Sequence, residues 1–164
     1  MSTTKEFHTV NPATGTNIKS YTYMSDALVD QKIETCHNAF LSWKKTSLAD
    51  RAKHIQKLGK ELLKNKDKLS ALMTEEMGKL LKQGHQEVEL CAGICDYTAE
   101  NGPKELADED RTLPEGGKGR IVHSPMGVVY GIQPWNFPTY QVIRYAVANL
   151  MAGNGVLLKH AESV

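Results

Sequence analysis

The segment MGVVYGIQPWNFPTYQVIRYAVANLMAGNGVLLKHA, residues 126–161, carries the clearest fold signal in this chain. Its first seven residues are mostly apolar, as in a buried strand, and GVLLKHA at its end indicates a second apolar strand. Between them, apolar residues at steps of three and four predict a helix that ends near Gly153: Tyr140, Ile143, Val147 and Leu150. A strand, a helix and a strand within about 35 residues form a βαβ unit, whose two strands are normally parallel. The predicted fold class is therefore α/β.

A sheet of two parallel strands leaves its faces and edges uncovered. We therefore expect residues 119–164 to be the start of a Rossmann-like dinucleotide-binding sheet that is incomplete within this chain. GRIVHSP, at residues 119–125, indicates a further short strand ahead of the βαβ unit.

Residues 26–101, upstream of the predicted sheet, are expected to be helical. The first helix carries apolar residues on one face at steps of four and three: Val29, Ile33, Cys36, Phe40 and Trp43. Ser47, with Asp50 three residues later, resembles the capping box that starts a helix. The polar residues 100–119 are expected to form a hinge between these helices and the sheet. Residues 7–23 predict two short strands around the turn NPATG.

The composition is that of an ordinary globular protein, with 164 residues, 40% hydrophobic residues and a net charge of +1. A net charge this small gives no long-range attraction to nucleic acid or to an anionic membrane. No apolar run approaches the roughly 18 residues of a membrane-spanning helix. The polar N-terminus shows no signal peptide. Three cysteines, none paired at metal-ligand spacing, favour a reducing compartment, most simply the cytoplasm. We therefore expect no metal, nucleic acid or membrane partner.

The motif PWNFP follows the first predicted strand of the βαβ unit. It places Asn136 between two aromatic residues, Trp135 and Phe137, and closes both ends with proline. A loop that only had to turn the chain would not need two large aromatic side chains, and loops at the ends of buried strands are common positions for sites. The motif is therefore the first candidate for a functional site.

Several motifs together resemble the aldehyde dehydrogenase superfamily, in order and over the whole chain. They are VNPATG at 10–15, EEMGK at 75–79, SPMGVVYGIQPWNFP at 124–138 and LLKHAES at 157–163. The triplet KHA resembles the branch that oxidises succinate semialdehyde, since most other branches have proline in place of His160. The resemblance implies that residues 1–164 are the N-terminal part of an NAD-binding domain, from an oxidoreductase that acts on a small aldehyde and is homo-oligomeric at full length.

The resemblance gives Asn136 a catalytic role. In the family, a cysteine thiolate attacks the aldehyde and forms a tetrahedral thiohemiacetal with a negative oxygen. The amide N–H of Asn136 would help to form the oxyanion hole for this oxygen, and the flanking prolines would keep the loop rigid. The alternative is that Asn136 only caps the helix that starts near Thr139, although it lies rather far ahead of that helix.

The resemblance also implies a cofactor site at the ends of the two parallel strands. Lys159 would donate hydrogen bonds to the adenosine ribose, Glu162 would accept them, and Trp135 would lie beside the nicotinamide half. Four further residues are expected to contact the cofactor: Ile132, Gln133, His160 and Ala161. A carboxylate at position 162 would repel the 2′-phosphate of NADP, so we expect a preference for NAD, with NADP as the other possible cofactor.

The nucleophilic cysteine and the general-base glutamate of the family are carried in the later part of its chains. The three cysteines of this sequence, Cys36, Cys91 and Cys95, match neither position. We therefore expect the 164-residue chain alone to be inactive, although it belongs to an NAD(P)-dependent enzyme by resemblance. The alternative is a truncated, non-catalytic paralogue that binds nucleotide or docks on a full-length subunit.

Overall fold

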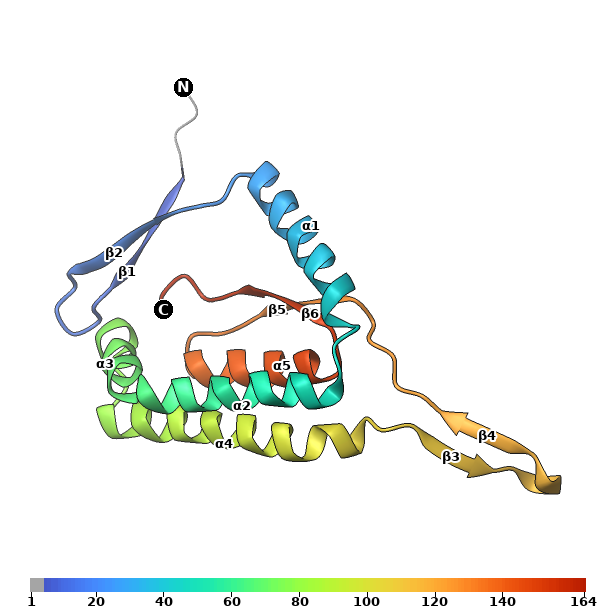
Figure 1. Cartoon of the computed structure of the whole chain (residues 1–164). Helices are drawn as coiled ribbons and strands as arrows, with labels where there is room; N and C mark the ends of the chain where they lie inside the picture. The colour runs from blue at the N-terminus through green and yellow to red at the C-terminus, as the bar shows by residue number, and fades with distance from the viewer. Residues whose placement is uncertain (1–4) are drawn as a thin grey trace.

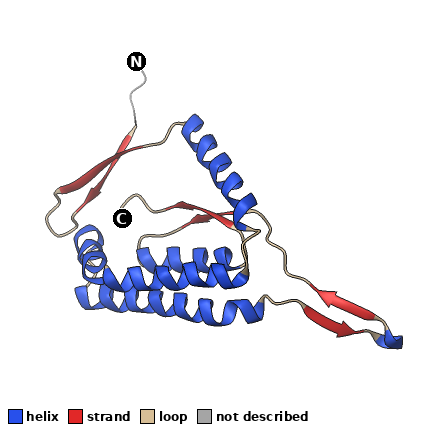
Figure 2. Cartoon of the chain, in the orientation of Figure 1, coloured by secondary structure: helices blue, strands red, loops and turns tan. Residues whose placement is uncertain are grey.

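The N-terminal segment forms a β-hairpin. A computed structural model describes residues 5–164 of the chain (Figures 1 and 2). Strand β1 (Glu6–Val10) pairs antiparallel with β2 (Asn17–Thr22), as predicted for residues 7–23. The turn between them depends on Asn11, whose side-chain oxygen accepts hydrogen bonds from the amides of Ala13 and Thr14, at 2.9 and 3.3 Å.

Four helices follow, which confirms the predicted helical region. They are α1 (Asp26–Trp43), α2 (Leu48–Lys64), α3 (Lys66–Met77) and α4 (Leu81–Glu105). The predicted start of α2 is also present, because the Ser47 hydroxyl accepts a hydrogen bond from the Asp50 amide at 3.1 Å. None of the helices within residues 5–164 is long and apolar enough to cross a bilayer.

The βαβ unit forms as expected, and its two strands lie between helices. Strands β5 (Val128–Ile132) and β6 (Gly155–Lys159) are parallel, with Ile132 opposite Lys159 at their carboxyl ends, and α5 (Pro138–Met151) connects them. The two strands lie between α1 and α5 (Figure 1). The fold is thus a mixed α/β arrangement with an incomplete Rossmann-like sheet.

The hydrophobic core lies where α5 packs against α2 and α4 (Figure 1). Its buried members come from α2 to α5: Ile55, Leu62, Met73, Val88, Cys91, Cys95, Ile143, Val147 and Met151. Close approach of α2 and α4 requires Gly59, because a Cβ atom there would lie 3.0 Å from the Cβ atom of Cys95. This core fixes α5, and with it the loop that precedes α5.

Residues 100–119 are not the simple hinge that their polar composition suggested. Helix α4 continues through Pro103 to Glu105, and the chain then forms an antiparallel hairpin of β3 (Glu109–Thr112) and β4 (Lys118–Ile121) around a short 3-10 turn. The hairpin projects from the body of the molecule (Figure 1). Strand β4 therefore pairs with β3 and not with the parallel sheet, so the prediction that this sheet starts at residue 119 is wrong for β4.

Candidate functional site

The candidate site lies at the carboxyl edge of the two parallel strands. The Gln133 amide donates a hydrogen bond to the Lys159 carbonyl at 3.0 Å, so the two loops that follow β5 and β6 start side by side. We call residues 133–137 the first loop and residues 160–164 the second loop. Trp135, Asn136 and Phe137 of the first loop are all exposed. The predicted cofactor residues Ile132 and Lys159 occupy opposite positions of the ladder at this edge.

Asn136 does not cap α5. Phe137 occupies the cap position and makes no side-chain capping bond. Within residues 5–164, the side-chain amide of Asn136 has no hydrogen-bond partner, and the residue is exposed. The capping alternative is therefore wrong, and the amide of Asn136 is available to a ligand.

The N-terminus of α5 is capped instead by a carboxylate from α4. Oε1 of Glu87 accepts hydrogen bonds from the amides of Thr139 and Tyr140, each at 2.9 Å. The Glu87 side chain is 1% exposed. A carboxylate at this position satisfies amides that have no partner within the helix and interacts favourably with the helix dipole. Glu87 thus anchors the helix that begins just after Asn136.

Lys79 completes a buried network beneath the first loop. Its ammonium forms an ion pair with Glu87, donates to the backbone carbonyl of Asn136 at 3.0 Å, and lies 3.9 Å from the centre of the Phe137 ring. Gly78, with φ of 71°, ends α3 in the left-handed conformation and precedes Lys79 directly. The sequence alone gives Lys79 only as part of the motif EEMGK and gives no role to Glu87. The reason is that the sequence does not show which distant segment either side chain contacts.

The second loop is connected to the start of α5 through His160. Nδ1 of His160 accepts a hydrogen bond from the Ala161 amide, and Nε2 lies 3.0 Å from the carbonyl oxygen of Pro138. Since Nδ1 is the acceptor, Nε2 carries the proton and donates a hydrogen bond to the Pro138 carbonyl oxygen. Glu162 of this loop lies beside Lys159, with their charged atoms 3.8 Å apart and both side chains about half exposed. A hydrogen bond with Glu162 also raises the pKa of Tyr23 above its ordinary value.

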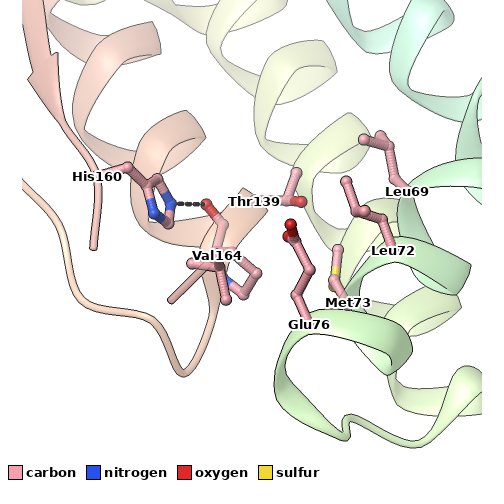
Figure 3. Close-up of a pocket in the computed structure, with 8 residues that line it drawn as sticks. Leu69, Leu72, Met73, Glu76, Thr139, His160 and Val164 are labelled. Atoms are coloured by element: carbon pink, nitrogen blue, oxygen red, sulfur yellow. Dashed lines mark hydrogen bonds between the residues drawn. The ribbon is translucent and has the colours of Figure 1, made fainter. Parts of the chain in front are cut away.

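A small cavity lies behind the second loop (Figure 3). Its volume is about 130 Å³, and its walls come from α3, the start of α5 and the second loop: Leu69, Leu72, Met73, Glu76, Pro138, Thr139, His160 and Val164. Glu76 is only 9% exposed, and burial raises the pKa of its carboxyl group above the ordinary value. The cavity is therefore mostly apolar, with one buried carboxyl group in its wall.

The three cysteines do not have the properties of a nucleophile. Cys91 and Cys95 are fully buried in the core, and burial raises their thiol pKa values to about 12 and about 11. Burial also raises the pKa of Cys36, which donates a hydrogen bond to the Val156 carbonyl. A thiol with a raised pKa is protonated at neutral pH and is a weak nucleophile. In the part of the chain that the structure describes, no group of three or more metal-ligating side chains comes together.

Comparison with known proteins identifies close relatives. Residues 1–164 match the profile of the aldehyde dehydrogenase family. The succinate-semialdehyde dehydrogenase [NADP(+)] of Deinococcus radiodurans is 40% identical over 158 residues, which cover 96% of this chain and 33% of the relative. The succinate semialdehyde dehydrogenase [NAD(P)+] of Escherichia coli is 37% identical over 94% of this chain and 33% of its own length.

Solved structures agree with the sequence comparison. The succinic semialdehyde dehydrogenase of Streptococcus pyogenes, in complex with NADP+, has a TM-score of 0.90 at 30% identity and covers 96% of this chain and 34% of that chain. Gox0499, studied for cofactor and substrate selection, has a TM-score of 0.93 at 32% identity, over 97% of this chain and 35% of that chain. The chain thus spans about a third of the length of the relatives it matches.

Proposed function

The chain belongs to the aldehyde dehydrogenase family, and from this membership we propose that it is the N-terminal third of an NAD(P)-dependent enzyme that oxidises succinate semialdehyde or a related short aldehyde to its carboxylic acid. The named relatives support the substrate class, and they are about three times as long as this chain. Cys91 and Cys95 are buried and Cys36 is half-buried, so none of them is a suitable nucleophile. In this proposal the nucleophilic cysteine therefore belongs to the rest of the enzyme.

Asn136 is the catalytic residue that this part of the enzyme contributes. When a thiolate adds to the aldehyde carbon, the carbonyl oxygen becomes an anion. The side-chain amide of Asn136 donates a hydrogen bond to this oxygen and stabilises the transition state that leads to it. NAD(P)+, held at the carboxyl edge of β5 and β6 with Lys159 and Glu162 toward its ribose, would supply the hydride acceptor that oxidation of the same carbon requires, and water would supply the second oxygen of the acid.

One observation carries this proposal: the Asn136 amide is exposed and has no hydrogen-bond partner in the described chain, while the backbone that follows it is anchored by buried charged groups. A donor that is already in place loses little energy to reorganisation when charge develops. An exposed asparagine in a mobile loop would not have this advantage.

The carboxyl edge of the parallel strands suits the cofactor, since dinucleotides bind at this position in open α/β sheets. Lys159 and Glu162 are half exposed there and offer donors and an acceptor to ribose hydroxyls. The relatives bear names with NADP(+) or NAD(P)+, so the preference for NAD that was expected from Glu162 finds no support in them. We therefore propose that the enzyme accepts both cofactors, with the Lys159 ammonium partly neutralising the Glu162 carboxylate.

The test is the substitution Asn136→Ala in the full-length enzyme. We expect kcat with succinate semialdehyde to fall by roughly 10²–10³, the usual loss for one oxyanion donor, with little change in the KM of the cofactor. Asn17→Ala, at an exposed position of β2, is the matched control and should leave kcat unchanged. Normal turnover of Asn136→Ala would refute the role.

The non-catalytic alternative makes a different prediction about the gene. If the reading frame continues past Val164 into a segment with a cysteine nucleophile, the chain is part of a complete enzyme. A stop codon directly after Val164 would instead favour a truncated paralogue that binds nucleotide or docks on a full-length subunit.

A further inference from the structure

We propose that Lys79 and Glu87 are positioning residues for the oxyanion donor: together they fix the peptide group that follows Asn136 and the first turn of α5, and so set the direction of the Asn136 side chain. This inference rests on the catalytic role proposed for Asn136. It assigns a function to a buried ion pair that lies on α4 and on the α3–α4 connection, outside the loop that carries the chemistry.

The pair holds the backbone at two points, one at the end of the first loop and one in the first turn of α5. Lys79 donates to the carbonyl oxygen of Asn136 at 3.0 Å, and its ammonium lies over the Phe137 ring. Glu87 accepts from the amides of Thr139 and Tyr140. The two points lie on opposite sides of the Phe137–Pro138 bond, so the short segment between them cannot shift without breaking hydrogen bonds of a buried charged group.

The prolines of the motif do not provide this restraint alone. Proline fixes its own φ and restricts the residue before it. The peptide plane between Asn136 and Phe137 is set by ψ of Asn136 and φ of Phe137, and neither angle belongs to a proline ring. The Asn136 carbonyl oxygen lies in this plane, so the hydrogen bond from Lys79 fixes its orientation. With no other partner in residues 5–164, the Asn136 side chain depends on this plane for its direction.

A role in stability alone accounts for this buried pair less well than a role in positioning Asn136. The desolvation cost of two buried charges often offsets their attraction, and well-packed apolar residues of similar volume serve stability as well or better. Both side chains are nearly inaccessible, 6% exposed for Lys79 and 1% for Glu87. The hydrogen bonds that each makes outside the pair go to the Asn136 carbonyl and to the first turn of α5. The hydrogen bonds of the pair therefore go to the end of the first loop and to the start of α5.

The test is a double-mutant cycle in the full-length enzyme, with Lys79→Met and Asn136→Ala. We expect Lys79→Met to lower kcat about 10- to 100-fold without raising the KM of the cofactor, because a displacement of about 1 Å can cost on the order of 10²-fold in rate. In the Asn136→Ala background, Lys79→Met should have almost no further effect on kcat, since it acts through Asn136. Lys82→Met, at an exposed position three residues away, is the matched control.

A second variant separates positioning from folding. Lys79→Met/Glu87→Gln leaves no unpaired buried charge, and the glutamine oxygen can still accept from the α5 amides, yet the Asn136 carbonyl stays without its donor. We expect this variant to fold, to bind cofactor normally and to keep the low kcat. A normal kcat in it, or effects of Lys79→Met and Asn136→Ala that multiply, would overturn the inference. If Asn136→Ala itself turned over normally, the proposed function would fail instead.

Discussion

The first and second loops follow neighbouring parallel strands, but the structure holds them by different means. Each has a lysine–glutamate pair beside it. Lys79 and Glu87, under the first loop, are almost fully buried and make three hydrogen bonds to its backbone and to the start of α5. Lys159 and Glu162, at the second loop, are half exposed and separated by 3.8 Å. The same two residue types therefore have different physical roles at the two positions.

This difference matches the tasks proposed for the two loops. An oxyanion donor must be in place before charge develops, so a rigid first loop favours catalysis. A cofactor binds and leaves in each cycle, and side chains that are solvated in its absence can exchange water for the ligand. Buried charges are strongly affected by the loss of a partner, whereas exposed pairs are screened and contribute about 0–1 kcal/mol. Matched substitutions in the two pairs can therefore test the comparison.

The largest expected effect is that of Glu87→Ala on stability. The substitution leaves the Lys79 ammonium buried without a counter-ion and removes the acceptor of the Thr139 and Tyr140 amides. We expect the free energy of unfolding to fall by about 3–5 kcal/mol, as for other broken buried pairs. Urea unfolding followed by tryptophan fluorescence measures this change.

Glu162→Ala is the matched control for this experiment. Its partner Lys159 is half exposed, so the loss should be between about 0 and 1 kcal/mol. Similar losses for Glu87→Ala and Glu162→Ala would show that burial does not distinguish the two pairs.

A second prediction concerns Gly131, on the strand that leads into the first loop. A Cβ atom at this position would lie 2.5 Å from Cζ of Tyr145, and the Tyr145 hydroxyl donates to the Leu157 carbonyl of β6 and lies 3.3 Å from that of Val129. The ring is thus held against both strands and cannot move aside easily. We expect Gly131→Ala to lower the free energy of unfolding by about 1–3 kcal/mol, the usual cost of overpacking.

Gly93→Ala is the control for that substitution. Gly93 lies on an exposed face of α4, where a Cβ atom meets nothing within 4 Å. Alanine there should raise the free energy of unfolding by about 0.5–1 kcal/mol, because glycine is the poorer helix former. Destabilisation by both substitutions would indicate that contact with Tyr145 is not the cause.

Periodicity along the sequence predicted the βαβ unit and the position of the first loop, because strand and helix patterns are local properties. The network beneath the loop was not predictable in this way. Lys79 is 57 residues from Asn136, and Glu87 is 52 residues from Thr139. In the sequence both look like charges on a helix surface, and only the packing of α4 against α5 brings them to the loop.

The β3–β4 hairpin shows a different limit. Its strands are short and exposed, so they lack the apolar alternation that marks a half-buried strand. Pairing across the hairpin, such as the hydrogen bond from Arg120 to Asp110 at 2.7 Å, joins residues whose charges alone indicated a solvated linker. The polar composition of this segment therefore favours a hinge when the sequence is considered alone.

The third prediction concerns Glu76, the buried carboxyl group behind the second loop. Burial raises its pKa above the ordinary 4.5, and Glu75 adds to the rise, whereas a hydrogen bond with Thr9 and the nearby His160 and Lys19 oppose it. Between 4.5 and the raised pKa, the folded chain binds more protons at Glu76 than the unfolded chain does. The Glu76 contribution to stability therefore falls as pH rises through this window. Glu76→Gln should remove this dependence and raise stability at neutral pH.

The measurement for Glu76 is the urea midpoint as a function of pH in the wild type and the variant. Glu75→Gln is the matched control, because its side chain is exposed on the same helix. The expectation fails if Glu76→Gln lowers the midpoint at neutral pH, or if Glu75→Gln changes the pH dependence as much.

The smallest expected effect is that of Glu162→Ser on cofactor choice. If Glu162 accepts hydrogen bonds from the ribose, its carboxylate also faces the 2′-phosphate of NADP, and the two negative charges repel. The Lys159 ammonium, 3.8 Å away, and the surrounding solvent reduce this repulsion to the range of an exposed pair, about 1 kcal/mol or less. Removal of the carboxylate should therefore raise the ratio of kcat/KM for NADP over NAD by no more than about fivefold.

Steady-state kinetics of the full-length enzyme with both cofactors measure the ratio, and Ser163→Ala, at the exposed neighbouring position, is the control. A ratio that stays the same in Glu162→Ser would show that this carboxylate does not contact the ribose, whereas a change of a hundredfold would mean that the second loop is as tightly organised as the first.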